Sequence, residues 1–284
     1  MSAALAADAK TMARDQWERA AAGWDRHTPV IRQWLRTATD TMLGMAGISP
    51  GAHVLDVAAG AGDQTLDIAR RVGPEGSVLA TDFSPTLLTL AQQRADAAGF
   101  SQVTTLVADG EHLPDDIGPF DAAVCRLGLM LFTDPLQGLR EMHRVLRPGG
   151  GICTLVFSRP EKNPCVALLL RTAMQHAGLP PRDPFQPGGL LSLGRPGLID
   201  ELFEQAGFEE VATTAIEAPF RLPSARHYLD FVRASASPIQ QILSRLDATA
   251  QDAAWSDMET RLHAFDTPEG WVGPNELLLT AARR

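Results

Sequence analysis

Residues 54–63 read Val-Leu-Asp-Val-Ala-Ala-Gly-Ala-Gly-Asp, and this stretch decides the fold. The apolar residues at its start are typical of a strand covered on both faces, as in a parallel sheet. Residues 58–62 carry no side chain larger than a methyl group, so a ligand can lie against their backbone. The helix expected over 63–72 points its N-terminal amides and positive dipole end at this turn. The stretch therefore predicts a strand, a ligand-binding turn and a helix.

The spacing of the small residues argues against a dinucleotide site. A G-x-G-x-x-G fingerprint that starts at Gly60 needs a small residue at position 65, where Thr65 stands. The pattern D-x-[GA]-x-G-x-G fits better, and its fixed positions are Asp56, Ala58, Gly60 and Gly62. In this frame we expect Asp56 to receive a ligand's ammonium group, directly or through water. A tight turn without a ligand explains the same residues, so the motif needs support from elsewhere in the chain.

Two further carboxylates end the next expected strands. Asp82 ends the second strand and suits bidentate hydrogen bonding to ribose hydroxyls, and Phe83 after it can cover an adenine face. Asp109 ends the third strand, before Gly110, where it can accept from an adenine amino group. Carboxylates that merely cap helices are the alternative. Three of them at one sheet edge favour a nucleoside site.

With these motifs in place, the chain resembles the class I S-adenosylmethionine-dependent methyltransferases, near their ubiquinone/menaquinone-biosynthesis branch. The matching segments are VLDVAAGAGD, ATDFS, VADGEHLP, FDAAVCRLGLMLFTDP and RVLRPGGG, in order between residues 54 and 151. One departure is Ala58, where the family more often has glycine. The resemblance implies an α/β fold with a Rossmann-like, seven-stranded, mostly parallel sheet and helices on both faces. It also implies S-adenosylmethionine as cofactor, S-adenosylhomocysteine as product, and binding residues among those named above.

The rest of the chain predicts a helical cap over this core. Trp17, Trp24 and Trp34 are dense for a chain that is otherwise poor in aromatic residues. They either pin N-terminal helices to the core or belong to a lid over methyl donor and acceptor. We expect an N-terminal lid over 1–50, a cofactor-binding half over 51–158, cap insertions over 159–194 and 219–268, and the remaining core over 195–218 and 269–284.

The end of the fourth strand should face the reacting groups. Arg126 there either holds an acidic group of cofactor or substrate or pairs with a neighbouring aspartate. The residues after it form an apolar wall in which Leu127 and Met130 are candidate substrate contacts, together with Trp24 of the lid. The sequence thus favours a small acceptor with an apolar or aromatic part, methylated at O, C or N.

Composition narrows the class of partner. The net charge is −9 and no basic face stands out, which disfavours nucleic acid as a substrate. The chain has three cysteines without metal-ligand or disulfide spacing, which suggests a reducing cytoplasm and no bound metal. No apolar run predicts a signal peptide or a membrane span. The expected partner is a small molecule, in secondary metabolism, and the oligomeric state stays open.

The catalytic base is the least determined part. Of seven histidines, His27 lies in the expected lid and His227 opens a helix of the second insertion. Either can take a proton near neutral pH, but an acceptor that is already nucleophilic needs only orientation. Two alternatives to methyl transfer remain: a cyclisation or decarboxylation on the same fold with bound cofactor, or a non-catalytic binding protein.

Overall fold

The computed structural model describes residues 3–235 and 237–284 and contains a seven-stranded main sheet in the order β3-β2-β1-β4-β5-β10-β6. Strands β1 to β5 run parallel, and β10 runs antiparallel to both of its neighbours. This confirms the predicted Rossmann-like sheet. The strand bounds are β1 (His53–Val57), β2 (Ser77–Asp82), β3 (Val103–Val107), β4 (Phe120–Arg126), β5 (Leu146–Phe157), β6 (Glu209–Glu217) and β10 (Glu276–Arg283).

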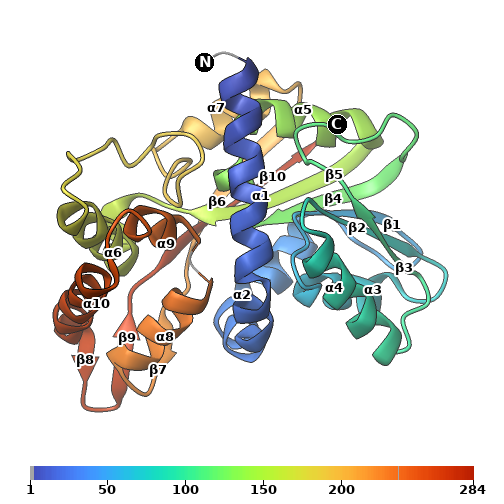
Figure 1. Cartoon of the computed structure of the whole chain (residues 1–284). Helices are drawn as coiled ribbons and strands as arrows, with labels where there is room; N and C mark the ends of the chain where they lie inside the picture. The colour runs from blue at the N-terminus through green and yellow to red at the C-terminus, as the bar shows by residue number, and fades with distance from the viewer. Residues whose placement is uncertain (1–2, 236) are drawn as a thin grey trace.

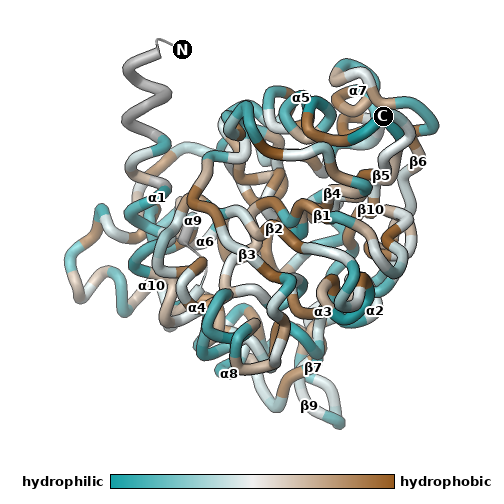
Figure 2. Tube along the Cα trace, turned by 90° about the vertical axis from the view of Figure 1, so that its right-hand side faces the viewer, coloured by the Kyte–Doolittle hydropathy of each residue, from teal (hydrophilic) through white to brown (hydrophobic). Residues whose placement is uncertain are grey.

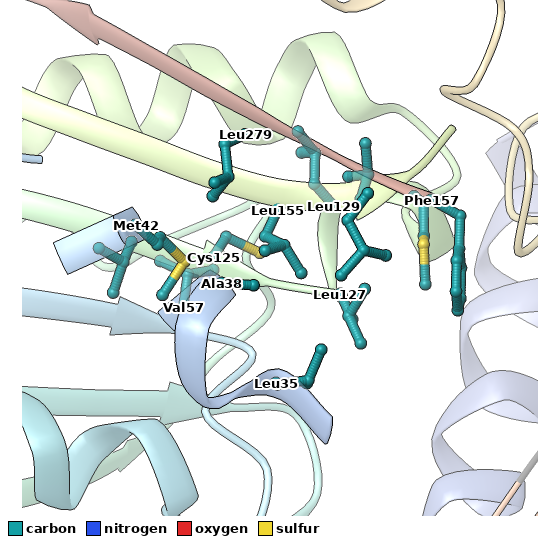
Figure 3. Packing of buried hydrophobic residues seen from close by; sticks show 14 of the residues in the cluster. Leu35, Ala38, Met42, Val57, Cys125, Leu127, Leu129, Leu155, Phe157 and Leu279 are labelled. Atoms are coloured by element: carbon teal, nitrogen blue, oxygen red, sulfur yellow. The ribbon is translucent and has the colours of Figure 1, made fainter. Parts of the chain in front are cut away.

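Helices cover both faces of the sheet (Figure 1). On one face lie α2 (Thr28–Met45), α3 (Asp63–Val72) and α4 (Pro85–Ala97); on the other lie α5 (Pro135–Val145) and α7 (Leu198–Gln205). Figure 2 shows hydrophobic residues along the central strands and hydrophilic ones on the outer helices. In Figure 3, Met42 of α2 packs near Cys125 of β4 and Leu155 of β5, all of them fully buried. This continuous core fixes the edge at which the parallel strands end.

A second group of elements forms the cap beside the sheet. It contains α6 (Pro164–His176), α8 (Ala225–Ser235), α9 (Ser237–Leu243) and α10 (Ala248–Leu262), with a small sheet of β7 (Phe220–Leu222), β9 (Gly270–Gly273) and β8 (Asp266–Thr267). Helix α1 (Ala3–Arg26) runs between this cap and the main sheet (Figure 1). It approaches α8 so closely that a Cβ at Gly23 would lie 2.0 Å from the Ala234 carbonyl oxygen. Three short 3₁₀ helices, η1 (Leu129–Leu131), η2 (Pro160–Lys162) and η3 (His263–Phe265), complete the elements.

Two of the expected segments are divided in the structure. The segment 269–284, expected to complete the core, contains two strands in different sheets, because Pro274 breaks the pairing and Trp271 belongs to β9. The segment predicted as one lid over 1–50 also divides. Helix α2 is part of the core, since Ile31 and Leu35 are fully buried in it, and only α1 lies outside the sheet layers. Over residues 3–235 and 237–284, no helix combines the length and apolar character that crossing a membrane requires.

Candidate functional site

A cavity of about 390 Å³ lies where β1 to β4 end, beneath α1. It joins most of the residues predicted to bind a nucleoside. Its wall includes the expected Trp24, Ala58, Gly60, Asp82, Phe83, Asp109, Gly110, Arg126 and Leu127. It also includes side chains that the sequence did not single out, among them Lys10, Arg14, Asp63 and Gln64. We call it the larger cavity.

The Asp82 carboxylate is held by backbone amides at the cavity wall. Its Oδ2 accepts from the Gly60 N–H at 3.0 Å and its Oδ1 from the Ser84 N–H at 2.9 Å. Each carboxylate oxygen keeps a further lone pair, so a diol can still bind. Burial raises the pKa of Asp82 to about 6, although these amides oppose the shift. The hydrogen bond from Gly60 to Asp82 therefore joins the glycine turn to the end of β2.

Asp56 and Gly62 occupy positions behind the cavity rather than in its wall. The Asp56 oxygens accept from Gln64 Nε2 at 2.8 Å and from the Thr65 hydroxyl at 2.6 Å. Burial raises the pKa of Asp56 to about 6, against the effect of those bonds. Gly62 is the αL residue before α3 and leaves room for Ala91, whose Cβ would lie 2.8 Å from an added Cβ. Both residues shape the turn, and the expected contact of Asp56 with a ligand is replaced by contacts inside the protein.

Asp63 takes the place in the wall that was expected of Asp56. Its Oδ2 accepts from Arg126 Nη2 at 2.6 Å, and Arg126 Nη1 donates to the Thr39 hydroxyl at 2.8 Å. Arg126 therefore pairs with a neighbouring aspartate, one of the two roles expected of it. The other oxygen, Asp63 Oδ1, is buried without a hydrogen bond, and Arg32 Nε stays 3.6 Å away. Its position directly after Gly62 was the sequence signal that could have identified it.

Two residues of the cavity wall adopt positive φ although they are not glycine. Ala58 has φ 54° and Leu127 has φ 59°. Such left-handed conformations cost energy and concentrate at functional sites. The structure accommodates the Ala58 methyl group by placing Gly128 opposite, where an added Cβ would lie 2.5 Å from the Ala58 Cβ. An alanine at the position where the family favours glycine is thus matched by a glycine across the turn.

Helix α1 closes the larger cavity and is held there by charge. Lys10 Nζ lies 2.6 Å from Asp109 Oδ2, 2.7 Å from Glu111 Oε2 and 3.4 Å from His112 Nδ1. Burial opposes the positive charge of Lys10, but the two carboxylates outweigh it and raise its pKa. Asp109, Glu111 and His112 are close enough together to hold a metal ion, but the Lys10 ammonium already pairs with both carboxylates. These contacts of Lys10 explain how α1 is held over the larger cavity.

A second cavity of about 80 Å³ adjoins the first and is apolar. We call it the apolar cavity. Trp17, Trp24, Leu127 and Leu131 line both cavities, so the two meet at these side chains. Met130, which the sequence suggested as a substrate contact, lines the apolar cavity. The remaining lining is Trp34, Phe157, Val166, Leu169, Leu190, Phe220, Tyr228, Phe231, Val232, Ser235, Pro238 and Ile239.

Neither candidate histidine lies in the wall of either cavity. His27 Nδ1 is hydrogen-bonded to the Gly23 carbonyl at 2.8 Å, and its ring packs edge-on against Phe231. His227 is exposed at the start of α8 and hydrogen-bonds to the Ser224 hydroxyl at 2.8 Å. His27 thus lies at the junction of α1 and α2 and His227 on the surface, and neither is among the residues that line the two cavities. The prediction of a histidine base therefore has no geometric support.

The fold and site define a Rossmann-like methyltransferase architecture. A putative methyltransferase from Bacillus halodurans C-125 superimposes with a TM-score of 0.60 at 19% identity, covering 87% of this chain and 98% of that one. The [4+2]-cyclase SpnF gives a TM-score of 0.55 at 20% identity, covering 94% and 96%. At such identities the likeness concerns the fold.

The chain belongs to the ubiE/COQ5 methyltransferase family, whose profile matches residues 28–172, about half of its length. One relative is the ubiquinone/menaquinone biosynthesis C-methyltransferase UbiE of Geobacter sp. (strain M21). It is 38% identical over 132 residues, which are 46% of this chain and 54% of that protein. The chain thus spans about half the length of the curated relatives it matches. The matched half holds β1 to β5 and the glycine turn, whereas most of the cap lies outside it.

Proposed function

We propose that this protein is an enzyme that transfers a methyl group from S-adenosylmethionine to a small, apolar or aromatic metabolite. The observation that carries the proposal is the junction of two unlike cavities. The larger one has carboxylates and backbone amides arranged for a nucleoside, and the apolar one opens beside it at Trp24 and Leu127. A donor and an acceptor that bind in these two spaces meet at the junction.

The larger cavity fits S-adenosylmethionine by its donor and acceptor groups. Asp82 presents a carboxylate to ribose hydroxyls, and Phe83 lies beside it in the wall. Asp63 Oδ1 accepts no hydrogen bond from the described residues and has a long ion pair with Arg32, so it can accept from the ammonium of the methionine part.

S-adenosylmethionine supplies, when bound, an electrophilic methyl group on a positively charged sulfur. The protein's own residues have to orient an acceptor and exclude water. Trp17 and Trp24 of α1 cover the junction, and Lys10 fastens that helix to Asp109 and Glu111. The residues described around the apolar cavity include no carboxylate, histidine or lysine to serve as a base. We therefore infer that positioning, rather than proton removal by a side chain, carries the reaction.

The lining of the apolar cavity also indicates the class of acceptor. The relatives named ubiquinone/menaquinone C-methyltransferases act, by those names, on ring compounds, and an apolar cavity lined by aromatic residues suits a ring. We extend the proposal to a small neutral metabolite and leave quinone itself as one member of the class. Three free, buried cysteines support a reducing compartment such as the cytoplasm.

A panel assay for S-adenosylhomocysteine release tests the proposal. Purified protein is incubated with S-adenosylmethionine and phenols, quinols, apolar amines and small carboxylates. We expect turnover with ring compounds and none with small, highly charged acceptors. His27→Ala and His227→Ala should keep turnover, whereas Asp82→Ala should lose it. Consumption of an acceptor without S-adenosylhomocysteine would contradict methyl transfer and favour a cyclase-like reaction.

A further inference from the structure

The lining of the apolar cavity restricts which ligands can bind there, because the described residues that form it include no charged side chain. A carboxylate or phosphate brought into it would lose water and find no counter-ion, which is a large cost. Its aromatic rings include Trp34 and Phe220, which are stacked with centroids 4.0 Å apart. Such a lining favours a flat, neutral ring as ligand, because this ligand has no charge to desolvate and can stack on the aromatic side chains.

Two polar groups of this lining have partners inside the protein. The Ser235 hydroxyl donates to the Phe231 carbonyl at 2.6 Å, and Trp34 Nε1 donates to the Ala218 carbonyl at 2.6 Å. Tyr228 is 3% exposed and lines the cavity, and no hydrogen bond joins its hydroxyl to another described residue. The Trp17 and Trp24 indole N–H groups also lack such a bond among the described residues, but they lie at the junction with the larger cavity. A donor that no protein group engages is available to a ligand, so a ligand that brings an acceptor atom to it gains binding energy.

The Tyr228 ring is held in place by neighbours on several sides. It stacks on Trp271 with centroids 4.6 Å apart and meets Phe220 edge-on at 5.2 Å. Phe231 lies further away, at 6.4 Å. A ring fixed in this way loses little freedom when it hydrogen-bonds to a ligand, which makes it a suitable group for selecting substrates.

We propose that Tyr228 determines acceptor specificity: its hydroxyl donates a hydrogen bond to an oxygen atom of a neutral ring compound in the apolar cavity. This inference rests on the proposed function for the identity of the cavity as the acceptor site. Tyr228 belongs to the apolar cavity alone, whereas Trp24 and Leu127 border both cavities. An acceptor whose oxygen contacts Tyr228 therefore presents another part of its ring to the junction. Burial raises the pKa of Tyr228 well above its ordinary value, so the group stays a donor.

Binding of two matched probes tests the inference without turnover. The probes are 2-naphthol and 2-methylnaphthalene, which differ by a hydroxyl in place of a methyl group of similar size. Dissociation constants are measured by tryptophan fluorescence for the wild-type protein and Tyr228→Phe. We expect the variant to bind 2-naphthol about fivefold more weakly, the worth of one neutral hydrogen bond, and 2-methylnaphthalene as before. Thr260→Ala, which removes a hydroxyl of α10 outside the cavity, should change neither constant.

The outcomes separate this inference from the proposed function, because neither probe needs S-adenosylmethionine to bind. Equal changes for both probes would show a structural effect and overturn the role of Tyr228, as would wild-type protein that binds neither probe. If the variant fails to fold, an NMR measurement on the wild-type protein still tests the inference, because Tyr228 is the only tyrosine in the sequence. A single ζ-¹³C tyrosine resonance should then shift more with 2-naphthol than with 2-methylnaphthalene, and an equal response to both would refute the hydrogen bond.

Discussion

At the residue scale, Asp56 and Asp82 hold the glycine turn together while their carboxylates are buried. Their hydrogen bonds come from Gln64, Thr65 and backbone amides. Both pKa values are raised to about 6, chiefly by burial. The turn is thus built with charged groups that the interior disfavours, and its stability depends on pH.

The sign of this dependence is fixed by the raised pKa values. The unfolded chain releases each proton near pH 4, whereas the folded protein retains it to about pH 6. The folded state therefore binds more protons in this window, and the stability that these groups contribute is complete below about pH 4 and is lost as pH rises through about 6. We expect Asp56→Asn to remove about half of that loss, measured by urea unfolding at several pH values. An unchanged pH slope, equal to that of the exposed-site variant Asp115→Asn, would refute it.

A second residue-scale prediction concerns Ala58 and Gly128. Gly128→Ala should destabilise the protein by about 1–3 kcal/mol, because the new methyl group would lie 2.5 Å from the Ala58 Cβ and 2.9 Å from Cys125 Sγ. Ala58→Gly removes one of these clashes and relieves a positive φ. Gly128→Ala should therefore destabilise the protein less when Ala58→Gly is also present. Thermal unfolding of the four proteins of this cycle measures the coupling, and strictly additive effects would mean that the two residues do not compensate.

At the element scale, α1 is the helix on which closure of the site depends. Gly23 lets it approach α8 to within backbone contact, and an alanine there would place its Cβ 2.0 Å from the Ala234 carbonyl oxygen. We expect Gly23→Ala to displace α1, to speed amide exchange in that helix and to weaken S-adenosylhomocysteine binding. The core should stay folded, because α2 carries the buried residues that complete it.

Gly44→Ala is the matched control for this substitution. Gly44 lies in α2, and the nearest atom to an added Cβ is the end of the Arg71 side chain, at 3.8 Å. With space available, alanine should stabilise the helix by up to about 1 kcal/mol. If both glycine variants left amide exchange in α1 and ligand affinity unchanged, close packing of α1 on α8 would not control closure.

At the scale of the whole molecule, local motifs predicted the strands and the edge at which they end. Asp82, Phe83 and Asp109 lie in the cavity wall, as their positions at or just after the ends of β2 and β3 indicated, because the sheet fixes the direction of these strands. The contact of Lys10 with Asp109 joins residues 99 positions apart and leaves no local pattern. The role of Asp56 was misassigned, since the sequence does not reveal that Gln64 and Thr65 turn back to satisfy it.

The structure of the cap, too, could be predicted only in part from the sequence. Its insertions were predicted, but the small sheet was not, because β7, β8 and β9 are 2–4 residues long and too short for a recognisable alternation. The sequence likewise indicated as substrate contacts only Trp24, Leu127 and Met130 of the residues that line the apolar cavity. This cavity draws Phe157 from the core and Tyr228 and Phe231 from the cap, and only the fold brings these residues together.

The central claim is that the larger cavity binds S-adenosylmethionine, and calorimetry of the full chain with S-adenosylmethionine and with NAD tests it most directly. We predict one S-adenosylmethionine bound per chain, more tightly than NAD. Asp82→Ala should weaken this binding by about 1.5–3 kcal/mol, since it removes charge-assisted hydrogen bonds. NAD binding more tightly than S-adenosylmethionine, or an affinity for S-adenosylmethionine unchanged in Asp82→Ala, would contradict the account.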